Sequence, residues 1–348
     1  MNIGQLQQIG NCIGNASGQT IENRFTLRFA FILFSIMSCF VSFAQNSTAS
    51  SFKNDSILVI AKNPGKGFYN DYILFIPKGT PVNKKIFLLV EPNNTGKITD
   101  SIAIHKQYAI DLASVSSVGN NVSTELKTPL LVPVFPRPAS QPLLYTHALD
   151  RDAMLEKTPE LKRLDLQLLE MINDARDVLL TMGILVEPKF FMNGFSASAS
   201  FTNRFSFMHP DQIKALAIGG FNGELMLPQN KINGVKLNYP IGTNDFLKIT
   251  GGSFNIEAYR QIPQLIYMGK LDENDAVQFD DAYNDKERKI INDNIGRKVQ
   301  ERYLVCQTIY LKEGIHAIFK THENVGHWTT SAMNLEVIKF FLSQMREN

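Results

Sequence analysis

Short apolar runs alternate with longer amphipathic segments from about Ser56 onward. The runs predict β-strands at residues 57–61, 72–76, 86–90, 130–135, 190–193, 215–218, 265–268, 306–311 and 317–320. Several of them are continuously apolar and do not alternate, which is typical of strands that helices cover on both faces. The pattern therefore predicts an α/β fold with a mostly parallel central sheet.

Apolar residues spaced three and four positions apart predict helices between these strands. The clearest such segment carries Leu161, Leu164 and Leu168, and proline after His209 indicates the end of another helix. The helices are expected at residues 160–182, 196–208, 285–302 and 330–345.

The N-terminal segment has the layout of a secretory signal. Residues 29–44 form an apolar run that follows Arg24 and Arg28 and ends in Ser-Phe-Ala before a polar stretch. We expect residues 1–44 to be a signal peptide with its leader, cleaved after Ala44, so that the protein is exported. A lipoprotein anchored through Cys39 is the less favoured alternative, and no stable membrane span is expected after processing.

A polar linker at residues 45–55 and one α/β domain at residues 56–348 are expected to follow the leader. The composition is that of a globular protein, with 348 residues of which 44% are hydrophobic and 20% charged. Lys and Arg number 35 against 33 Asp and Glu, and this balance argues against nucleic acid as a partner. Removal of the leader would leave Cys306 as the one remaining cysteine. It lies in an apolar run and is expected to be a buried core residue.

Candidate chemistry begins at the sequence Gly194-Phe195-Ser196-Ala197-Ser198, which follows an apolar strand and opens a helix. A serine on such a sharp turn needs small residues two positions away on either side. Gly194 and Ser198 satisfy this need, although Ser198 stands where glycine is usual. The pattern favours a nucleophilic Ser196, and a serine that only caps the helix is the alternative.

Two later features fit a serine nucleophile. Asp272 comes just after a predicted strand, and His327 follows the last one. The order serine, acid, histidine is that of the α/β-hydrolase arrangement. Asp275 lies on the same loop and is the alternative acid.

These pieces together resemble secreted α/β-hydrolases of the polyhydroxybutyrate depolymerase and feruloyl esterase type. The matching stretches are VEPNNTG at 90–96, VPVFPRP at 132–138, MNGFSASAS at 192–200, IYMGKLDENDAV at 266–277 and ENVGHW at 323–328. The resemblance implies that Ser196 is the nucleophile, His327 the general base and Asp272 the orienting acid.

The oxyanion hole of such an enzyme takes one donor from the residue after the nucleophile, here the backbone N–H of Ala197. The second donor is expected from Asn93 or Asn94, since Pro92 has no N–H. His147 is a possible residue of the substrate cleft, and Arg137 is expected to pair with a carboxylate. No cofactor and no metal ion are expected, because the acidic run from Asp272 to Asp285 lacks the ligand spacing of a calcium loop.

The sequence thus predicts an exported serine hydrolase that cleaves a small or polymeric carboxylic ester through an acyl-enzyme. The ester preference rests on the resemblance. A peptidase of the same fold and a catalytically silent binding protein on this scaffold are the alternatives. Residues 221–262 are expected to shape the pocket as a lid, a cap or a plain excursion.

Overall fold

The computed structural model describes residues 51–94, 96–115 and 117–346. The expected signal peptide, its cleavage site after Ala44 and the alternative lipid anchor at Cys39 lie outside the described residues. Within the expected linker, Phe52 is bonded to the folded body. Its N–H donates to the carbonyl of Thr80 at 3.0 Å, and its own carbonyl accepts from the N–H of Gly79 at 2.8 Å.

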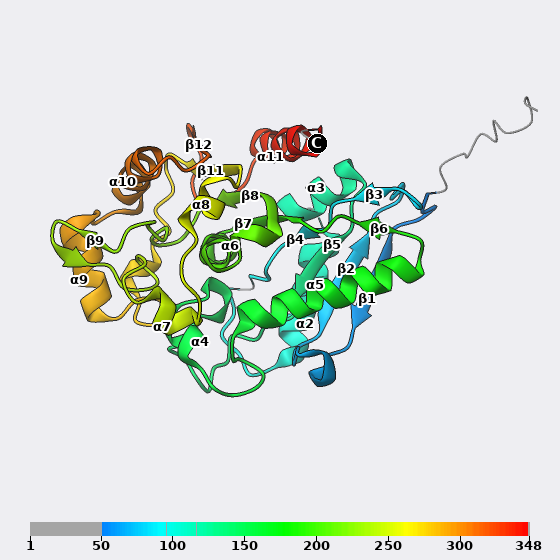
Figure 1. Ribbon diagram of the computed structural model, residues 1–348, viewed down its shortest axis with the longest axis horizontal. Helices are drawn as coiled ribbons and strands as arrows, with labels where there is room; N and C mark the ends of the chain where they lie inside the picture. The colour runs from blue at the N-terminus through cyan, green and yellow to red at the C-terminus, as the bar shows by residue number, and fades with distance from the viewer. Residues whose placement is uncertain (1–50, 95, 116, 347–348) are drawn as a thin grey trace, which may run out of the picture. The chain divides into compact units, whose positions relative to one another are not determined.

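The main sheet has eight strands in the order β1-β2-β5-β4-β7-β8-β11-β12 (Figure 1). Strand β2 runs antiparallel to its neighbours, and the strands from β5 to β12 are parallel to one another, as expected. The strands are β1 (Ser56–Ile60), β2 (Tyr72–Ile76), β4 (Leu89–Val90), β5 (Leu130–Pro133), β7 (Phe190–Phe195), β8 (Ile213–Gly219), β11 (Gln264–Gly269) and β12 (Ala317–His322).

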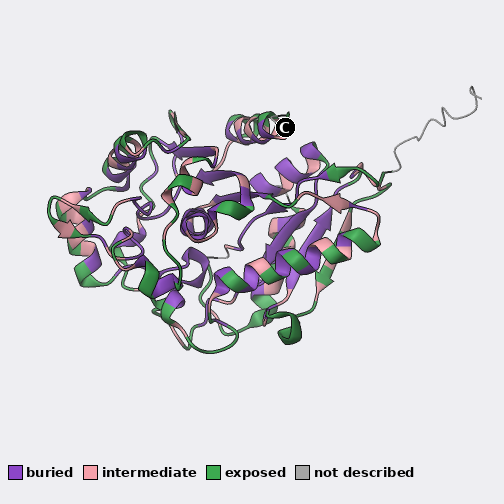
Figure 2. Cartoon of the chain, in the orientation of Figure 1, coloured by how far each residue is buried: buried purple, intermediate pink, exposed green. Residues whose placement is uncertain are grey.

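Each face of this sheet has its own hydrophobic core. On β7, Phe190 and Met192 join one core and Phe191 joins the other, because successive side chains of a strand point to opposite faces. Both faces are buried, which explains why these strands read as continuous apolar runs. Figure 2 shows the strands of the sheet as mostly buried, whereas α5 exposes one side.

The helices divide between these two cores. Apolar residues of α5, α6 and α10 lie in one, and those of α2, α3 and α11 lie in the other. The helices are α2 (Ile102–Ser114), α3 (Val118–Leu126), α4 (Arg151–Leu155), α5 (Leu164–Thr181), α6 (Ala197–Met208), α7 (Phe246–Thr250), α8 (Ile256–Arg260), α9 (Asp285–Asn294), α10 (Val299–Lys312) and α11 (Ser331–Arg346). Short 3-10 helices occupy 64–66, 146–148, 210–212 and 276–278.

The predicted strand at 306–311 is wrong, because these residues belong to α10. Tyr303, Cys306 and Tyr310 are buried at three- and four-residue spacing, the period of a helix face. Cys306 is a buried residue, as expected. The single helix predicted at 285–302 is instead two, α9 and the start of α10, separated around Gly296 at a φ of 156°.

The predicted strand at 86–90 is divided. Strand β3 (Lys85–Ile86) pairs with β6 (Leu185–Val186), and β4 pairs with β5 and β7 in the main sheet. A second small pair joins β9 (Lys231–Ile232) to β10 (Val235–Lys236). This hairpin lies in the segment 221–262 together with α7 and α8.

No helix among the described residues is long and apolar enough to span a bilayer.

Candidate active site

Ser196 lies on the turn between β7 and α6, and its backbone is strained. Its φ of 62° and ψ of −126° place it in a region that residues with a side chain rarely occupy. We call residues 194–198 the elbow. A Cβ atom at Gly194 would lie 2.3 Å from the carbonyl oxygen of Ser198, so the elbow accepts glycine at that position and no larger residue. The requirement for a small residue that the sequence suggested is therefore a physical one.

Ser198 fits the elbow because its hydroxyl bonds back across the turn. Its Oγ accepts from the N–H of Phe195 at 2.9 Å and donates to the carbonyl of the same residue at 2.8 Å. The side chain is buried, so it takes the place of glycine without leaving a polar atom unpaired.

The structure brings Ser196, His327 and Asp272 together. His327 Nε2 lies 2.9 Å from Ser196 Oγ, and its Nδ1 lies 2.9 Å and 3.1 Å from the two carboxylate oxygens of Asp272. The three residues follow β7, β11 and β12, which are parallel strands whose carboxyl ends meet at one edge of the sheet. A sheet of this topology thus gathers residues that are far apart in the chain.

Asp272 is held by several bonds. It is buried, and its carboxylate also accepts from the N–H of Asn274 at 3.0 Å. Gln300, from α10, donates to the backbone carbonyls of Gly269 and Asp272, at 2.9 Å in each case. The loop after β11 is therefore fixed by backbone contacts as well as by the carboxylate.

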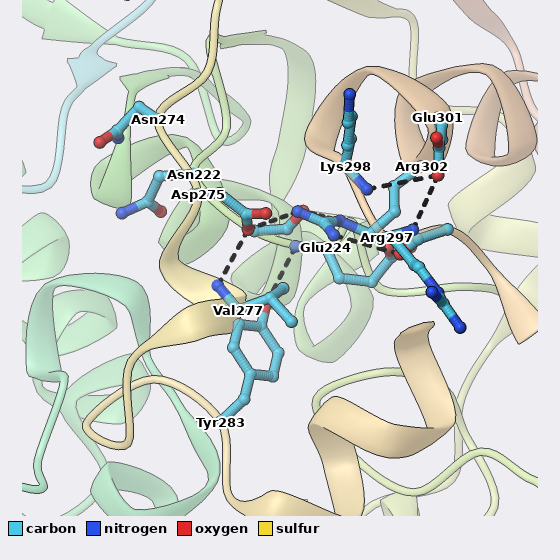
Figure 3. A network of polar contacts seen from close by, with 12 residues as sticks. Asn222, Glu224, Asn274, Asp275, Val277, Tyr283, Arg297, Lys298, Glu301 and Arg302 are labelled. Atoms are coloured by element: carbon cyan, nitrogen blue, oxygen red, sulfur yellow. Dashed lines mark hydrogen bonds and ion pairs between the residues drawn. The ribbon is translucent and has the colours of Figure 1, made fainter. Parts of the chain in front are cut away.

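Asp275, the alternative acid, is bonded to residues other than the histidine. Its carboxylate accepts from the N–H of Val277 at 3.0 Å and from the guanidinium of Arg302 (Figure 3). Arg302 is fully buried, and it also donates to the carbonyl of Gly223 at 2.9 Å. Asp275 therefore anchors the loop to α10, and the proposal of Asp275 as the acid partner of His327 is wrong.

Asn274 is a residue of the site that the sequence analysis missed. Its Nδ2 lies 3.1 Å from His327 Nε2, the same nitrogen that faces Ser196. A carboxamide two positions after the acid was the available signal. It carries little information alone, because asparagine is common in loops for reasons of turn geometry.

The candidate oxyanion donors are arranged around the elbow. The N–H of Ala197 opens α6 and is among the first helical N–H groups, which lack an intrahelical partner. Asn94 borders the cavity described below, and its side chain donates to the carbonyl of Phe195 at 3.2 Å. The side chain of Asn93 instead bonds both the N–H and the carbonyl of Phe135, at 3.1 Å and 2.9 Å. Asn93 thus braces the loop, and Asn94 is the residue of the pair that faces the site.

His147 does not line the cleft, contrary to expectation. It is buried, and its Nε2 lies 2.8 Å from the carbonyl of Phe135 and 3.3 Å from the amide of Asn93. Burial lowers its pKa to about 3, so the ring is neutral at physiological pH. The short helix that carries it packs against α6.

Glu91 begins the loop after β4, which carries Asn93 and Asn94, and it is also buried. Burial raises its pKa to about 7, because a charged carboxylate is poorly solvated there. A Cβ at Gly119 of α3 would overlap its Oε2, at 1.7 Å. The carboxyl group is thus packed closely between the loop and α3.

A cavity of about 630 Å³ opens onto Ser196 and His327. Its wall mixes apolar side chains with carboxamides and one ion pair, Arg137 with Asp281. The pairing of Arg137 with a carboxylate was expected. The other lining residues are Asn94, Gly96, Ile98, Tyr145, Phe195, Asn222, Asn274, Ala276 and Phe279. Among the described residues, no group of three or more His, Cys, Asp or Glu side chains is arranged to hold a metal ion.

Comparison with known proteins gives a fold and no closer relationship. No protein-family model and no curated protein matches the chain. The solved structure of poly(aspartic acid) hydrolase-1 from Sphingomonas sp. KT-1 is 15% identical, covers 83% of this chain and 98% of its own, and has a TM-score of 0.53. The poly(3-hydroxybutyrate) depolymerase LpqC from Bordetella parapertussis is 13% identical over 83% of this chain and 90% of its own, with a TM-score of 0.49. Together with the strand order, the first of these similarities shows that the chain has the α/β-hydrolase fold.

Proposed function

We propose that the chain is a serine hydrolase that cleaves carboxylic esters through an acyl-enzyme. The observation that carries the proposal is the continuous row of hydrogen bonds from Ser196 through His327 to Asp272, which ends in a cavity of substrate size. The strained backbone of Ser196 supports it, because such strain is concentrated at functional sites. That the Sphingomonas protein of the same fold is a hydrolase also agrees with it.

In this mechanism Ser196 Oγ attacks the ester carbonyl carbon while His327 Nε2 takes its proton. Asp272 stabilises the resulting imidazolium through Nδ1. The carbonyl oxygen becomes an oxyanion, which the N–H groups at Ala197 and Asn94 are proposed to stabilise. The C–O bond to the alcohol then breaks, and the alcohol leaves with the proton from His327.

Deacylation repeats these steps with water. His327 takes a proton from a water molecule, whose oxygen attacks the acyl carbon, and the proton then returns to Ser196 Oγ as the acid departs. The groups that are proposed to transfer protons and stabilise charge in this cycle belong to the chain itself. The choice of ester over amide rests on the resemblance of the motifs, since the same three side chains can cleave both.

The test is labelling by a fluorophosphonate probe, which reacts with activated serines. The protein purified from expression of the full chain should be labelled at Ser196, and Ser196→Ala should abolish the label. Ser206→Ala is the matched control, because Ser206 is a buried serine of α6, the helix that follows Ser196. This variant should still be labelled at Ser196. A folded protein that takes no label would refute the proposal and favour a silent binding scaffold.

A substrate comparison separates the esterase from a peptidase. The proposed enzyme should hydrolyse p-nitrophenyl esters faster than peptide p-nitroanilides. The reverse preference in a protein labelled at Ser196 would identify a peptidase.

We further propose that the protein is exported. The support is the basic flank of Arg24 and Arg28, followed by the apolar run and small residues of the segment 29–44.

A further inference from the structure

Arg137 is a charged side chain built into the wall of the candidate active-site cavity. It is only 8% exposed, yet it lines the cavity together with Ser196 and His327. Burying a guanidinium is costly unless its charge is paired and its N–H groups are bonded. Asp281, which lines the same cavity, supplies the opposite charge.

The position of this arginine is fixed from several sides. Its backbone N–H donates to Nε2 of His105 at 3.2 Å, and its carbonyl accepts from the N–H of Thr99 at 3.0 Å. Its guanidinium stacks on the ring of Tyr145, 3.8 Å from the centroid, and donates through Nη2 to Asp281. A group held in this way loses little conformational entropy when it binds a ligand.

Hydrogen-bond donors remain on this wall. Nε of Arg137 is buried without a hydrogen-bond partner, and Nη1 takes part in no hydrogen bond with residues 51–94, 96–115 and 117–346. The hydroxyl of Tyr145 accepts from the side chain of Asn222 at 2.9 Å, and the same described residues include no acceptor for its proton. Both residues border the cavity, so the group that they suit is an oxygen acceptor.

The charge of the wall selects the kind of oxygen. Arg137 and Asp281 neutralise each other, and the other described residues that line the cavity, apart from His327, are uncharged. A substrate carboxylate would be attracted by Arg137 but repelled by Asp281 beside it. A neutral carbonyl oxygen can accept a hydrogen bond from the guanidinium of Arg137 without that repulsion.

We propose that Arg137 is a specificity-determining residue that donates a hydrogen bond to a second, neutral carbonyl oxygen of the substrate, apart from the carbonyl that is cleaved. Tyr145 holds the guanidinium and offers a further donor, and Asp281 disfavours carboxylates at the same position. The inference rests on the proposed ester hydrolysis and names the class of ester: one that carries an additional ketone, ester or amide carbonyl.

Matched substrate pairs test this inference. The acyl pair is p-nitrophenyl 4-oxopentanoate and p-nitrophenyl pentanoate, and the alcohol pair is acetonyl butyrate and isobutyl butyrate. In each pair the members differ in the second carbonyl. In at least one pair the wild-type protein should favour the carbonyl-bearing ester about tenfold to hundredfold in kcat/KM, the range expected for a hydrogen bond from a charged donor. Rates are corrected with Ser196→Ala, which also removes spontaneous hydrolysis from the comparison.

Two variants change the preference in opposite ways. Arg137→Met should bring the ratio within a pair close to one. Asp281→Asn leaves Arg137 without its counter-charge and should raise kcat/KM for p-nitrophenyl hemisuccinate, whose carboxylate replaces the ketone, about tenfold relative to the 4-oxopentanoate. Arg288→Met is the matched control, because Arg288 forms a neighbouring ion pair with Asp280 and does not line this cavity, and it should keep the wild-type ratios.

The outcomes separate this inference from the proposed function. A protein that hydrolyses both members of each pair equally well, or an Arg137→Met variant that keeps the wild-type ratio, overturns the role of Arg137 and leaves ester hydrolysis standing. If Arg137→Met does not fold, Asp281→Asn still decides, since an unchanged response to the hemisuccinate contradicts the role given to the ion pair. A protein that hydrolyses none of the esters and takes no fluorophosphonate fails the proposed function first.

Discussion

Replacing Ser198 with alanine removes one oxygen atom from the inner side of the elbow, and the effect should exceed that of an ordinary buried serine. That oxygen is bonded to both the N–H and the carbonyl of Phe195, the residue directly before Ser196. We expect Ser198→Ala to lower both the stability of the fold and the turnover of ester substrates.

The magnitude follows from what each partner of Ser198 loses. The carbonyl of Phe195 keeps the hydrogen bond from Asn94, so it remains paired. The N–H of Phe195 loses its acceptor, and water cannot replace it because Ser198 is 1% exposed. A neutral hydrogen bond contributes about 1 kcal/mol and an unpaired buried N–H costs about 1–3 kcal/mol, so the free energy of unfolding should fall by about 2–4 kcal/mol. A displaced Ser196 Oγ should also lower kcat about tenfold, since such geometric errors are expensive.

The assay is urea unfolding together with ester kinetics, with Ser206→Ala as the matched control. Ser206 is fully buried in the same helix, and its hydroxyl donates to the carbonyl of Asn203 at 2.6 Å. That carbonyl also lies in the helical ladder, so the control should lose less than about 1 kcal/mol and keep the wild-type kcat. Equal losses of stability and of kcat in the two variants would refute the role assigned to Ser198.

Further expectations concern the acid loop, the buried carboxyl and processing. Asp272→Asn should lower kcat about 10³- to 10⁴-fold by favouring the wrong tautomer of the histidine, whereas Asp275→Asn should chiefly lower the free energy of unfolding; an equal loss of kcat in both would contradict the assignment. Because burial raises the pKa of Glu91 from 4.5 to about 7, the folded chain keeps a proton there that the unfolded chain has lost, and wild-type stability should fall as pH rises between these values. In urea titrations at pH 5 and pH 8, Glu91→Gln should reduce that fall in the free energy of unfolding by on the order of 3 kcal/mol. The same pH dependence in the wild type and the variant would contradict the role of Glu91. Mass spectrometry of the protein exported from a bacterial host should find an N-terminus directly after Ala44, and an uncleaved exported chain would contradict the proposed signal peptide.

Local sequence predicted the central part of the fold well, because strands buried on both faces give an unmistakable pattern. Strand β2 has the predicted limits, and β11 and β12 differ from theirs by one or two residues. The error at Cys306 arose where β-branched and aromatic residues lie in a helix. Local propensity favours a strand there, and packing of Tyr303 and Tyr310 against the sheet decides otherwise.

The site was predictable where chain order carries information and not where it depends on side-chain direction. The positions of Ser196, Asp272 and His327 follow from strand ends, and the structure brings these residues together. Whether Asp272 or Asp275 faces the histidine depends on Arg302, a buried partner 27 residues beyond Asp275 in the chain. No local pattern contains that contact. His147 was misplaced for the same reason, since its burial is set by distant segments.

The anchoring of Asp275 by Arg302 also bears on the order in which the parts of the site are made during synthesis. Synthesis proceeds from the N-terminus, so residues 194–198 are made before α10. The loop that carries Asp272 can gain its bonds to Gln300 and Arg302 only after α10 is made, and His327 is made later still. A growing chain therefore contains Ser196 before it contains the histidine that would accept its proton. The last segments to leave the ribosome complete the row of hydrogen bonds from Ser196 to Asp272. A chain truncated before them would lack His327, the proposed general base.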